Sequence, residues 1–165
     1  MPFTPIHLGA GLAAKALGQR QFSLMIFAGS QVLMDIEPLL GIIYGWPVLH
    51  GVTHTLGGAL LIGTIAALIG KPISQWVLRY FRYDKWSMVW RNGFISAYIG
   101  TFSHIGLDAI MHSDMNPLLP IQYGNPWLIT ITVDQLHLLC LMLGIIGGLM
   151  MIIQKYWPKS AAKSP

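Results

Sequence analysis

Apolar residues of this chain gather in five long segments separated by shorter polar stretches. A helix that crosses a bilayer needs about 20 predominantly apolar residues, and the second to fifth segments reach that length. The first segment is shorter and could form a short span, a re-entrant helix or an interfacial helix. The five segments are residues 4–19, 22–43, 52–70, 92–112 and 134–154.

A connector rich in aromatic and basic residues follows the third segment. In residues 72–90, Trp and Tyr interleave with Arg and Lys, which is typical of the lipid headgroup layer. We therefore predict an all-α fold, a polytopic membrane helix bundle of about five membrane helices plus a short interfacial helix. Residues 1–157 are expected to form a single integral membrane domain, and residues 158–165 a disordered cytoplasmic tail.

Composition and charge support a membrane protein. Hydrophobic residues make up 54% of the chain and charged residues 10%, whereas soluble domains carry about 25% charged residues. The net charge of +4 could suggest a nucleic-acid partner, but the basic residues are confined to segment ends, so we expect none. The single cysteine, Cys140, cannot form an internal disulfide.

The basic residues also predict how the chain is oriented. They lie between the first two segments, in residues 71–91, and in residues 155–163, whereas residues 44–51 and 113–133 contain no Lys or Arg. Because positive residues favour the cytoplasmic side, the N-terminus is predicted outside and the C-terminus in the cytoplasm.

A polar stripe interrupts the fourth segment. His104, Asp108 and His112 are spaced four residues apart and so share one face of a helix. Unpaired polar groups in apolar surroundings cost several kcal/mol, so these side chains need partners, water or a metal ion. Counting helical rise from Arg20 and Arg91 puts four polar residues of three segments about 20–25 Å above the inner boundary: His7, Asp35, His104 and Asp108.

Two shorter motifs are expected near the same outer level. Pro38 predicts that the second segment's helix ends near Asp35, which would let Asp35 and Glu37 both turn inward; solvated acids at a helix end are the alternative. The third segment opens with His50 and His54, which share a helical face, and Thr53 is a reasonable N-cap.

These donors predict a metal site. His, Asp and Glu without a thiolate suit a divalent transition metal at a catalytic centre, most simply zinc, with manganese or iron as alternatives. The donors suffice for one or two ions. Glu37 is the expected base that accepts a proton from water, and His112 and Asp114 lie nearer the mouth, where they could protonate a leaving group. The expected ligands are His7, Asp35, His50, His54, His104 and Asp108.

The motifs resemble those of the membrane-bound metal-dependent hydrolases described as LexA-binding and inner-membrane-associated. The matching features are an early histidine, an acidic pair that ends a span, a Gly-x-Thr-His motif that opens the next, and a His-x-x-x-Asp helix followed by a proline-ended loop. In this chain they are His7, Met34-Asp35-Ile36-Glu37, Gly51-Val52-Thr53-His54, Ser103-His104-Ile105-Gly106-Leu107-Asp108 and Pro117-Leu118-Leu119-Pro120. Here Met34 replaces the family proline, and Glu37 replaces its second aspartate.

The resemblance implies a hydrolase of the cell (inner) membrane with its site near the outer face. A more distant similarity to zinc phospholipase C and P1 nuclease implies phosphoester chemistry. The expected function is hydrolysis of a lipid-linked or amphiphilic (phospho)ester by metal-activated water. The alternatives are a metal or proton transporter and a non-enzymatic membrane protein with a structural metal. The expected partners are the bilayer and a lipid-like substrate, and a homo-oligomer remains open.

Overall fold

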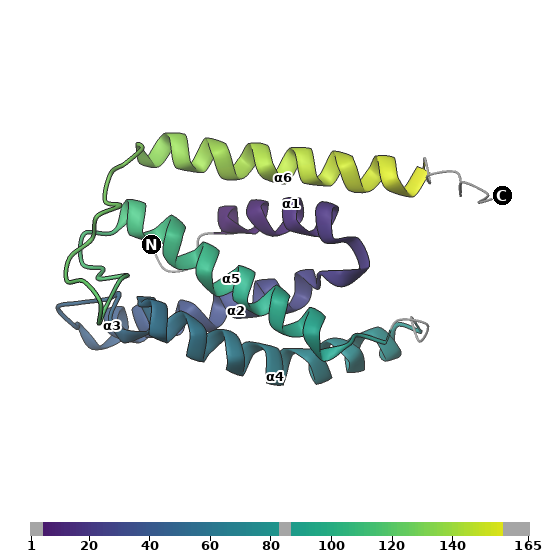
Figure 1. The fold of residues 1–165 in the computed structure, drawn as a ribbon, viewed down its shortest axis with the longest axis horizontal. Helices are drawn as coiled ribbons and strands as arrows, with labels where there is room; N and C mark the ends of the chain where they lie inside the picture. The colour runs from purple at the N-terminus through teal and green to yellow at the C-terminus, as the bar shows by residue number, and fades with distance from the viewer. Residues whose placement is uncertain (1–4, 83–86, 157–165) are drawn as a thin grey trace.

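A computed structural model describes residues 5–82 and 87–156. These residues form helices and loops, with no strand among them. Figure 1 shows the helices running roughly along one long axis. The α-helices are α1 (Leu8–Gly18), α2 (Leu24–Met34), α3 (Ile36–Tyr44), α4 (Leu56–Tyr80), α5 (Trp90–Met111) and α6 (Val133–Tyr156), and the short 3-10 helices are η1 (Pro5–His7), η2 (Gln19–Gln21) and η3 (Val52–His54).

Four stretches in the described part of the chain are long and apolar enough to cross a membrane, which indicates a membrane protein. They are α2 with α3 (Leu24–Tyr44), α4, α5 and α6. The predicted all-α membrane fold is confirmed, but a count of five spans is not. Helix α1 has 11 residues and is therefore about 16 Å long, too short for a hydrocarbon core of about 30 Å.

Helix α4 is longer than its apolar segment predicted. It continues through Pro72 to Tyr80, so residues 72–80 extend a membrane helix instead of forming a separate interfacial one. Pro72 removes one backbone hydrogen bond, which a helix packed against neighbours tolerates. Residues 83–86 of the predicted connector and the predicted tail at 158–165 lie outside the described residues.

The junction of α2 and α3 corrects the prediction for Pro38. Helix α2 ends next to Asp35 as expected, but α3 begins at once, because Asp35 N–H donates to Gln31 O (3.2 Å) and Leu39 N–H to Asp35 O (3.0 Å). Pro38 lies in the first turn of α3, where its missing N–H costs little. The helical path is nearly continuous, yet both carboxylates turn towards histidines: Asp35 Oδ1 lies 3.4 Å from His104 Nε2, and Glu37 Oε2 lies 3.8 Å from His54 Nδ1.

Helices α2, α4 and α5 pack closely around small and polar side chains. Ala67 and Ala97 are fully buried between them, and Ser96 Oγ accepts a hydrogen bond from Ser23 N–H at the start of α2 (2.8 Å). Helix α4 is capped by Thr55, whose hydroxyl accepts from Gly58 N–H (3.0 Å). The predicted cap, Thr53, lies two residues earlier, in η3, and has another role. This packing fixes the helices that carry the polar residues.

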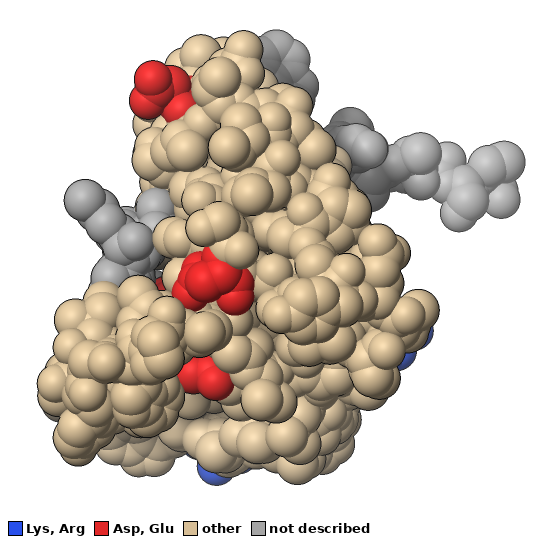
Figure 2. Space-filling view, turned by 90° about the vertical axis from the view of Figure 1, so that its left-hand side faces the viewer, with Lys and Arg blue, Asp and Glu red and all other residues tan. Residues whose placement is uncertain are grey.

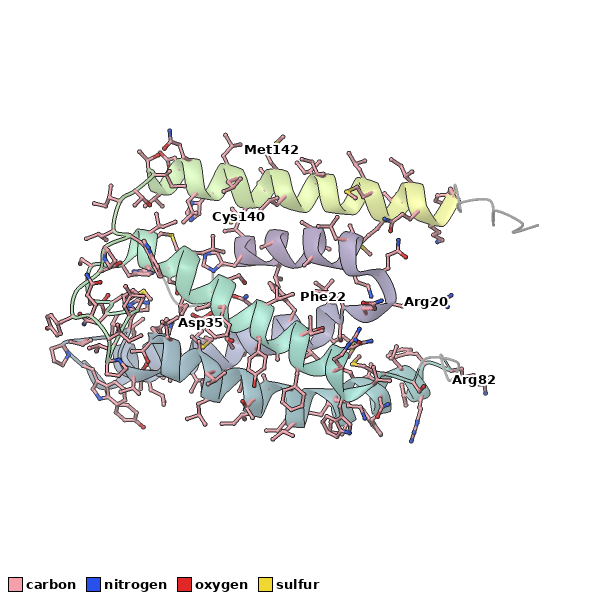
Figure 3. The ribbon with its side chains drawn as sticks, viewed as in Figure 1. Arg20, Phe22, Asp35, Arg82, Cys140 and Met142 are labelled. Atoms are coloured by element: carbon pink, nitrogen blue, oxygen red, sulfur yellow. The ribbon has the colours of Figure 1, made fainter. Side chains whose placement is uncertain are left out.

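Helix α6 lies along α1 and covers it on one side (Figure 1). Cys140 is buried against α1, whereas Met142 points away from the bundle (Figure 3). Gln154 Nε2 donates to Ala16 O (3.0 Å). The two backbones approach so closely at Gly147 that a Cβ there would lie 2.6 Å from Ala13 N.

We expect Gly147→Leu to separate α6 from α1. The added side chain would overlap the α1 backbone, and overpacking typically costs about 1–3 kcal/mol. Gly148→Leu is the matched control, because a Cβ at Gly148 meets nothing within 4 Å. Thermal unfolding in maltoside detergent checks this: only the variant at position 147 should melt at a lower temperature. Equal melting temperatures for both variants would show that this contact is not tight.

Candidate metal centre

Four buried side chains from three parts of the chain converge inside the bundle. Asp35 comes from the junction of α2 and α3 (Figure 3), His54 from the end of η3, and His104 and Asp108 from one face of α5. Their exposed fractions are 5%, 0%, 1% and 4% in that order. One nitrogen or oxygen of each lies within 4.8 Å of the others. We call this group the four-residue cluster.

The Nε2 atoms of the two histidines face the two carboxylates. His104 Nε2 lies 3.0 Å from Asp108 Oδ2 and 3.4 Å from Asp35 Oδ1. His54 Nε2 lies 3.6 Å from Asp108 Oδ2. The i, i+4 spacing on α5 brings His104 to Asp108, as the polar stripe predicted, and the tertiary fold adds Asp35 and His54. The third residue of the predicted stripe, His112, does not continue this face, because α5 ends at Met111 and His112 is extended.

The proton position on His104 follows from Gln31. Gln31 Nε2 donates to Gly100 O (2.9 Å), and this fixes the direction of the side-chain amide. Gln31 Oε1 then faces His104 Nδ1 (2.5 Å) and must accept a hydrogen bond from it. In its neutral form, His104 therefore carries its hydrogen on Nδ1 and presents an Nε2 lone pair to the aspartates.

The hydrogen bonds of Thr53 and Glu37 likewise determine which ring nitrogen of His54 carries the hydrogen. The Thr53 hydroxyl donates its single hydrogen to Glu37 Oε2, so Thr53 Oγ1 accepts from His54 Nδ1 (2.9 Å). Glu37 is held in place by Val52 N–H (3.1 Å) and Thr53 N–H (3.0 Å). Neutral His54 thus also presents an Nε2 lone pair to the cluster.

This arrangement fits a metal ion. The Nε2 atoms of His54 and His104 are buried and have no hydrogen-bond partner. Lone pairs that face carboxylate oxygens are repulsive unless a cation or proton lies between them. Outer partners that hold Nδ1–H and aim Nε2 are the usual support of metal-binding histidines. The buried Asp and His residues can therefore hold a metal ion.

His7 borders the four-residue cluster from α1. Its Nε2 atom lies 3.8 Å from Asp108 Oδ1, and its ring meets the His104 ring edge-on at 5.6 Å. The side chain is 2% exposed, and neither ring nitrogen has a hydrogen-bond partner. The structure thus brings the predicted ligand His7 beside the cluster without making it one of the four.

A second group of polar residues lies beside the cluster and contains His50, His112 and Asp114. Asp114 Oδ2 accepts from Leu49 N–H (2.9 Å) and His50 N–H (3.1 Å), and Asp114 Oδ1 lies 2.9 Å from His50 Nδ1. Burial raises the pKa of Asp114, but these hydrogen bonds outweigh burial and lower the pKa to about 2. Asp114 is therefore a fixed negative charge that orients His50.

The histidine rings of the second group are stacked. The rings of His50 and His112 lie 4.0 Å apart with 23° between their planes. Burial, with a smaller contribution from His50, lowers the pKa of His112 to about 4, so this ring is neutral at pH 7. His50, His112 and Asp114 each offer one ligand atom within 4.8 Å of the others, so this group could also hold a metal ion.

Comparison with known proteins adds nothing to this geometry. No family model, curated protein or solved structure matches the chain. The function must therefore be argued from the residues themselves.

The predicted site residues divide between the two groups. Asp35, His54, His104 and Asp108 come together and could hold a metal ion, with His7 beside them, whereas Glu37 belongs to neither group and contacts Thr53. The predicted ligand His50 belongs instead to the second group, where it contacts the cluster through its ring, 4.8 Å from that of His54. Sequence reasoning missed Gln31, although an amide one turn before Asp35 in an apolar helix is a signal that it has a buried partner.

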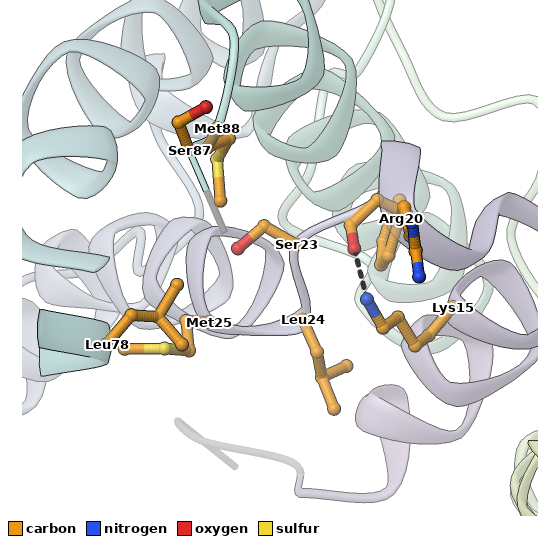
Figure 4. A pocket seen from close by; sticks show the side chains of 9 residues that line it. Lys15, Arg20, Ser23, Leu24, Met25, Leu78, Ser87 and Met88 are labelled. Carbon is orange, nitrogen blue, oxygen red and sulfur yellow. Dashed lines mark hydrogen bonds between the residues drawn. The ribbon is translucent and has the colours of Figure 1, made fainter. Parts of the chain in front are cut away.

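An open cavity of about 590 Å³ adjoins the second group. Its lining combines five apolar residues, Pro38, Ile42, Trp46, Pro47 and Leu49, with four polar ones, His50, His112, Ser113 and Asp114. A different cavity, of about 410 Å³, is lined by Lys15 and Arg20 (Figure 4) and lies at the end of the bundle away from Asp35 (Figure 3). Its Lys15 donates to Phe22 O (2.7 Å) and Gln19 O (2.7 Å), which ties the end of α1 to the start of α2.

Proposed function

We propose that this protein is a membrane-embedded, metal-dependent hydrolase of a lipid-linked or amphiphilic (phospho)ester. One observation carries the proposal. Two buried histidines, with Nδ1–H held by Gln31 and Thr53, aim unpartnered Nε2 atoms at two aspartates, and this cluster lies beside a histidine that lines an open cavity.

The donor set supports zinc, with manganese or iron as alternatives. Asp35, His54, His104 and Asp108 would hold the ion, and His7 is the nearest additional donor. Such an ion activates water and polarises an ester oxygen. The resemblance to inner-membrane hydrolases agrees with this proposal, because its matched residues His7, Asp35, His54, His104 and Asp108 meet at one place.

Proton transfer would fall to residues between the cluster and the cavity. Asp114 holds His50 through Nδ1, which leaves Nε2 of His50 as the atom that can take or give a proton. Glu37 as the base stays a prediction, but its carboxylate is bound by Thr53 and Val52. These contacts favour a positioning role for Glu37.

The surroundings favour hydrolysis over transport or a purely structural metal. Among the described residues, the buried histidine and carboxylate side chains are confined to the site end of the bundle: His7, Asp35, His50, His54, His104 and Asp108. An ion path would need such groups to continue toward the other end. A structural metal would need no adjoining cavity, because structural sites are closed.

We propose that the site faces the outer side of the membrane. Arg20 and Arg82 lie at the end of the molecule away from Asp35 (Figure 3), and the two loops at the site end contain no Lys or Arg. The positive-inside rule then assigns the basic end to the cytoplasm.

Metal removal tests the proposed activity. The purified protein should release headgroups from a mixed phospholipid and lipid-phosphate substrate, as measured by mass spectrometry of the soluble products. Chelation should abolish release, and one equivalent of zinc or manganese should restore it, because the lone pairs of His54 and His104 then regain their ion. Asp108→Asn gives the background rate. The proposal would be contradicted if the metal-loaded wild-type protein released headgroups from none of these esters faster than Asp108→Asn.

A further inference from the structure

The cavity beside His50 is lined by apolar residues, by neutral polar or histidine side chains, and by one carboxylate. Its one fully charged lining residue is Asp114, whose carboxylate is fixed by three hydrogen bonds. No Lys or Arg lines it. The loops that surround it, residues 45–55 and 112–132, contain neither type of residue.

The end of the bundle that carries the site is also acidic as a whole. Every acidic residue except Asp84 belongs to this end, and all ten Lys and Arg residues fall elsewhere in the sequence. Figure 2 looks onto this end and shows carboxylates on it, with basic side chains only at the margins. The carboxylates of Asp35 and Asp108 would neutralise one divalent ion, so a loaded centre adds no net positive charge.

The apolar lining of the cavity includes an aromatic ring and lies next to exposed apolar residues of α3. Trp46 lines the cavity, is 45% exposed and stacks with Tyr44 at 6.4 Å. Ile42, Ile43 and Tyr44 of α3 are also exposed apolar residues. An indole and a carboxylate that line the same cavity are a suitable environment for an ammonium group, and the exposed α3 surface is suitable for acyl chains.

We propose that this cavity binds the headgroup of an amphiphile that carries an ammonium group, with that group against Asp114 and Trp46. This inference rests on the proposed function and narrows its substrate class to zwitterionic lipids such as phosphatidylcholine or phosphatidylethanolamine. Anionic headgroups without an ammonium group bind less well, because Asp114 repels them and no cationic side chain attracts them.

Direct binding tests the charge preference without any need for turnover. Calorimetry in uncharged maltoside detergent would compare dihexanoylphosphatidylcholine with dihexanoylphosphatidylglycerol, each below its micellar concentration. Metal-loaded wild-type protein should bind the choline lipid at least about tenfold more tightly, the order expected for one partly screened charge. Equal binding, or tighter binding of the glycerol lipid, would overturn the proposal.

A charge placed in the cavity provides the matched variant. Ser113 lines the cavity and is exposed, so Ser113→Lys should fold normally and reduce the preference to below about twofold or reverse it. Ser113→Gln is the neutral control and should keep the preference. An unchanged preference in Ser113→Lys would contradict the assignment.

Two further comparisons show whether a negative result contradicts the headgroup site or the proposed hydrolase activity. Glycerophosphocholine, which has the headgroup without acyl chains, should bind at least about tenfold more weakly than the choline lipid. Equal binding of the two would contradict the proposal that the ligand is an amphiphile. A protein that prefers the choline lipid but hydrolyses nothing refutes only the proposed activity. A protein that hydrolyses esters without charge preference refutes only this headgroup site.

Discussion

Replacing His104 with alanine is expected to abolish stoichiometric metal binding. The change removes one nitrogen donor and leaves Asp35 and Asp108 as buried carboxylates that face each other without their nearest imidazole. Losing a ligand should lower metal affinity more than the loss of an outer partner, which typically costs about 10–100-fold. Elemental analysis of the purified protein, expressed as ions per chain, measures the effect.

Two further variants distinguish loss of metal binding from unfolding of His104→Ala. Removing one partner of a buried charged group can cost about 3–5 kcal/mol, so His104→Gln, which keeps a polar side chain of similar reach, is the milder change. His137→Ala is the matched control, because His137 belongs to neither polar group. One ion per chain in folded His104→Gln would refute the metal centre.

The second prediction concerns Thr53, which contacts no metal but holds His54. Thr53→Val keeps the shape of the side chain and removes the hydroxyl that joins Glu37 to His54 Nδ1. His54 then loses its fixed orientation, and metal affinity should fall by about 10–100-fold. Thr53→Ser keeps the hydroxyl and should bind metal like the wild type. Competition with a fluorescent chelator measures both affinities.

Glu37→Gln decides between the two roles of Glu37 in the same assay. If Glu37 positions His54 through Thr53, the variant should lose metal affinity together with Thr53→Val. If Glu37 is the proton acceptor, metal affinity should stay at the wild-type value while turnover falls. Equal metal affinity in Thr53→Val, Thr53→Ser and wild type would contradict the positioning role.

The sequence predicted the helices and much of the cluster because both depend on local spacing. Hydropathy located the four candidate spans, and the i, i+4 spacing put His104 and Asp108 on one face of α5. The helical rise per residue predicted that Asp35 lies at a depth similar to that of His104 and Asp108. These inferences need only the regular geometry of a helix, and they therefore transfer directly from sequence to structure.

The remaining features depend on contacts between segments far apart in the sequence. The pairing of Asp114 with His50 and Leu49 joins two loops, and loop conformations have no period that spacing can reveal. The Gln31 and Thr53 hydrogen bonds depend on rotamers set by tertiary packing. The sequence assigned residues 72–80 to an interfacial connector because aromatic and basic residues interleave there, whereas α4 continues through them to Tyr80.

The pairing of α1 with α6 has a consequence for how the protein matures in the cell. The hydrogen bond from Gln154 to Ala16 joins residues 138 positions apart, so α1 must wait for α6 to be synthesised before it gains its main partner. Helices α2 to α5 carry Asp35, His104 and Asp108 and leave the ribosome earlier. His7, at the start of α1, would then be the last of the buried histidines to reach its final place.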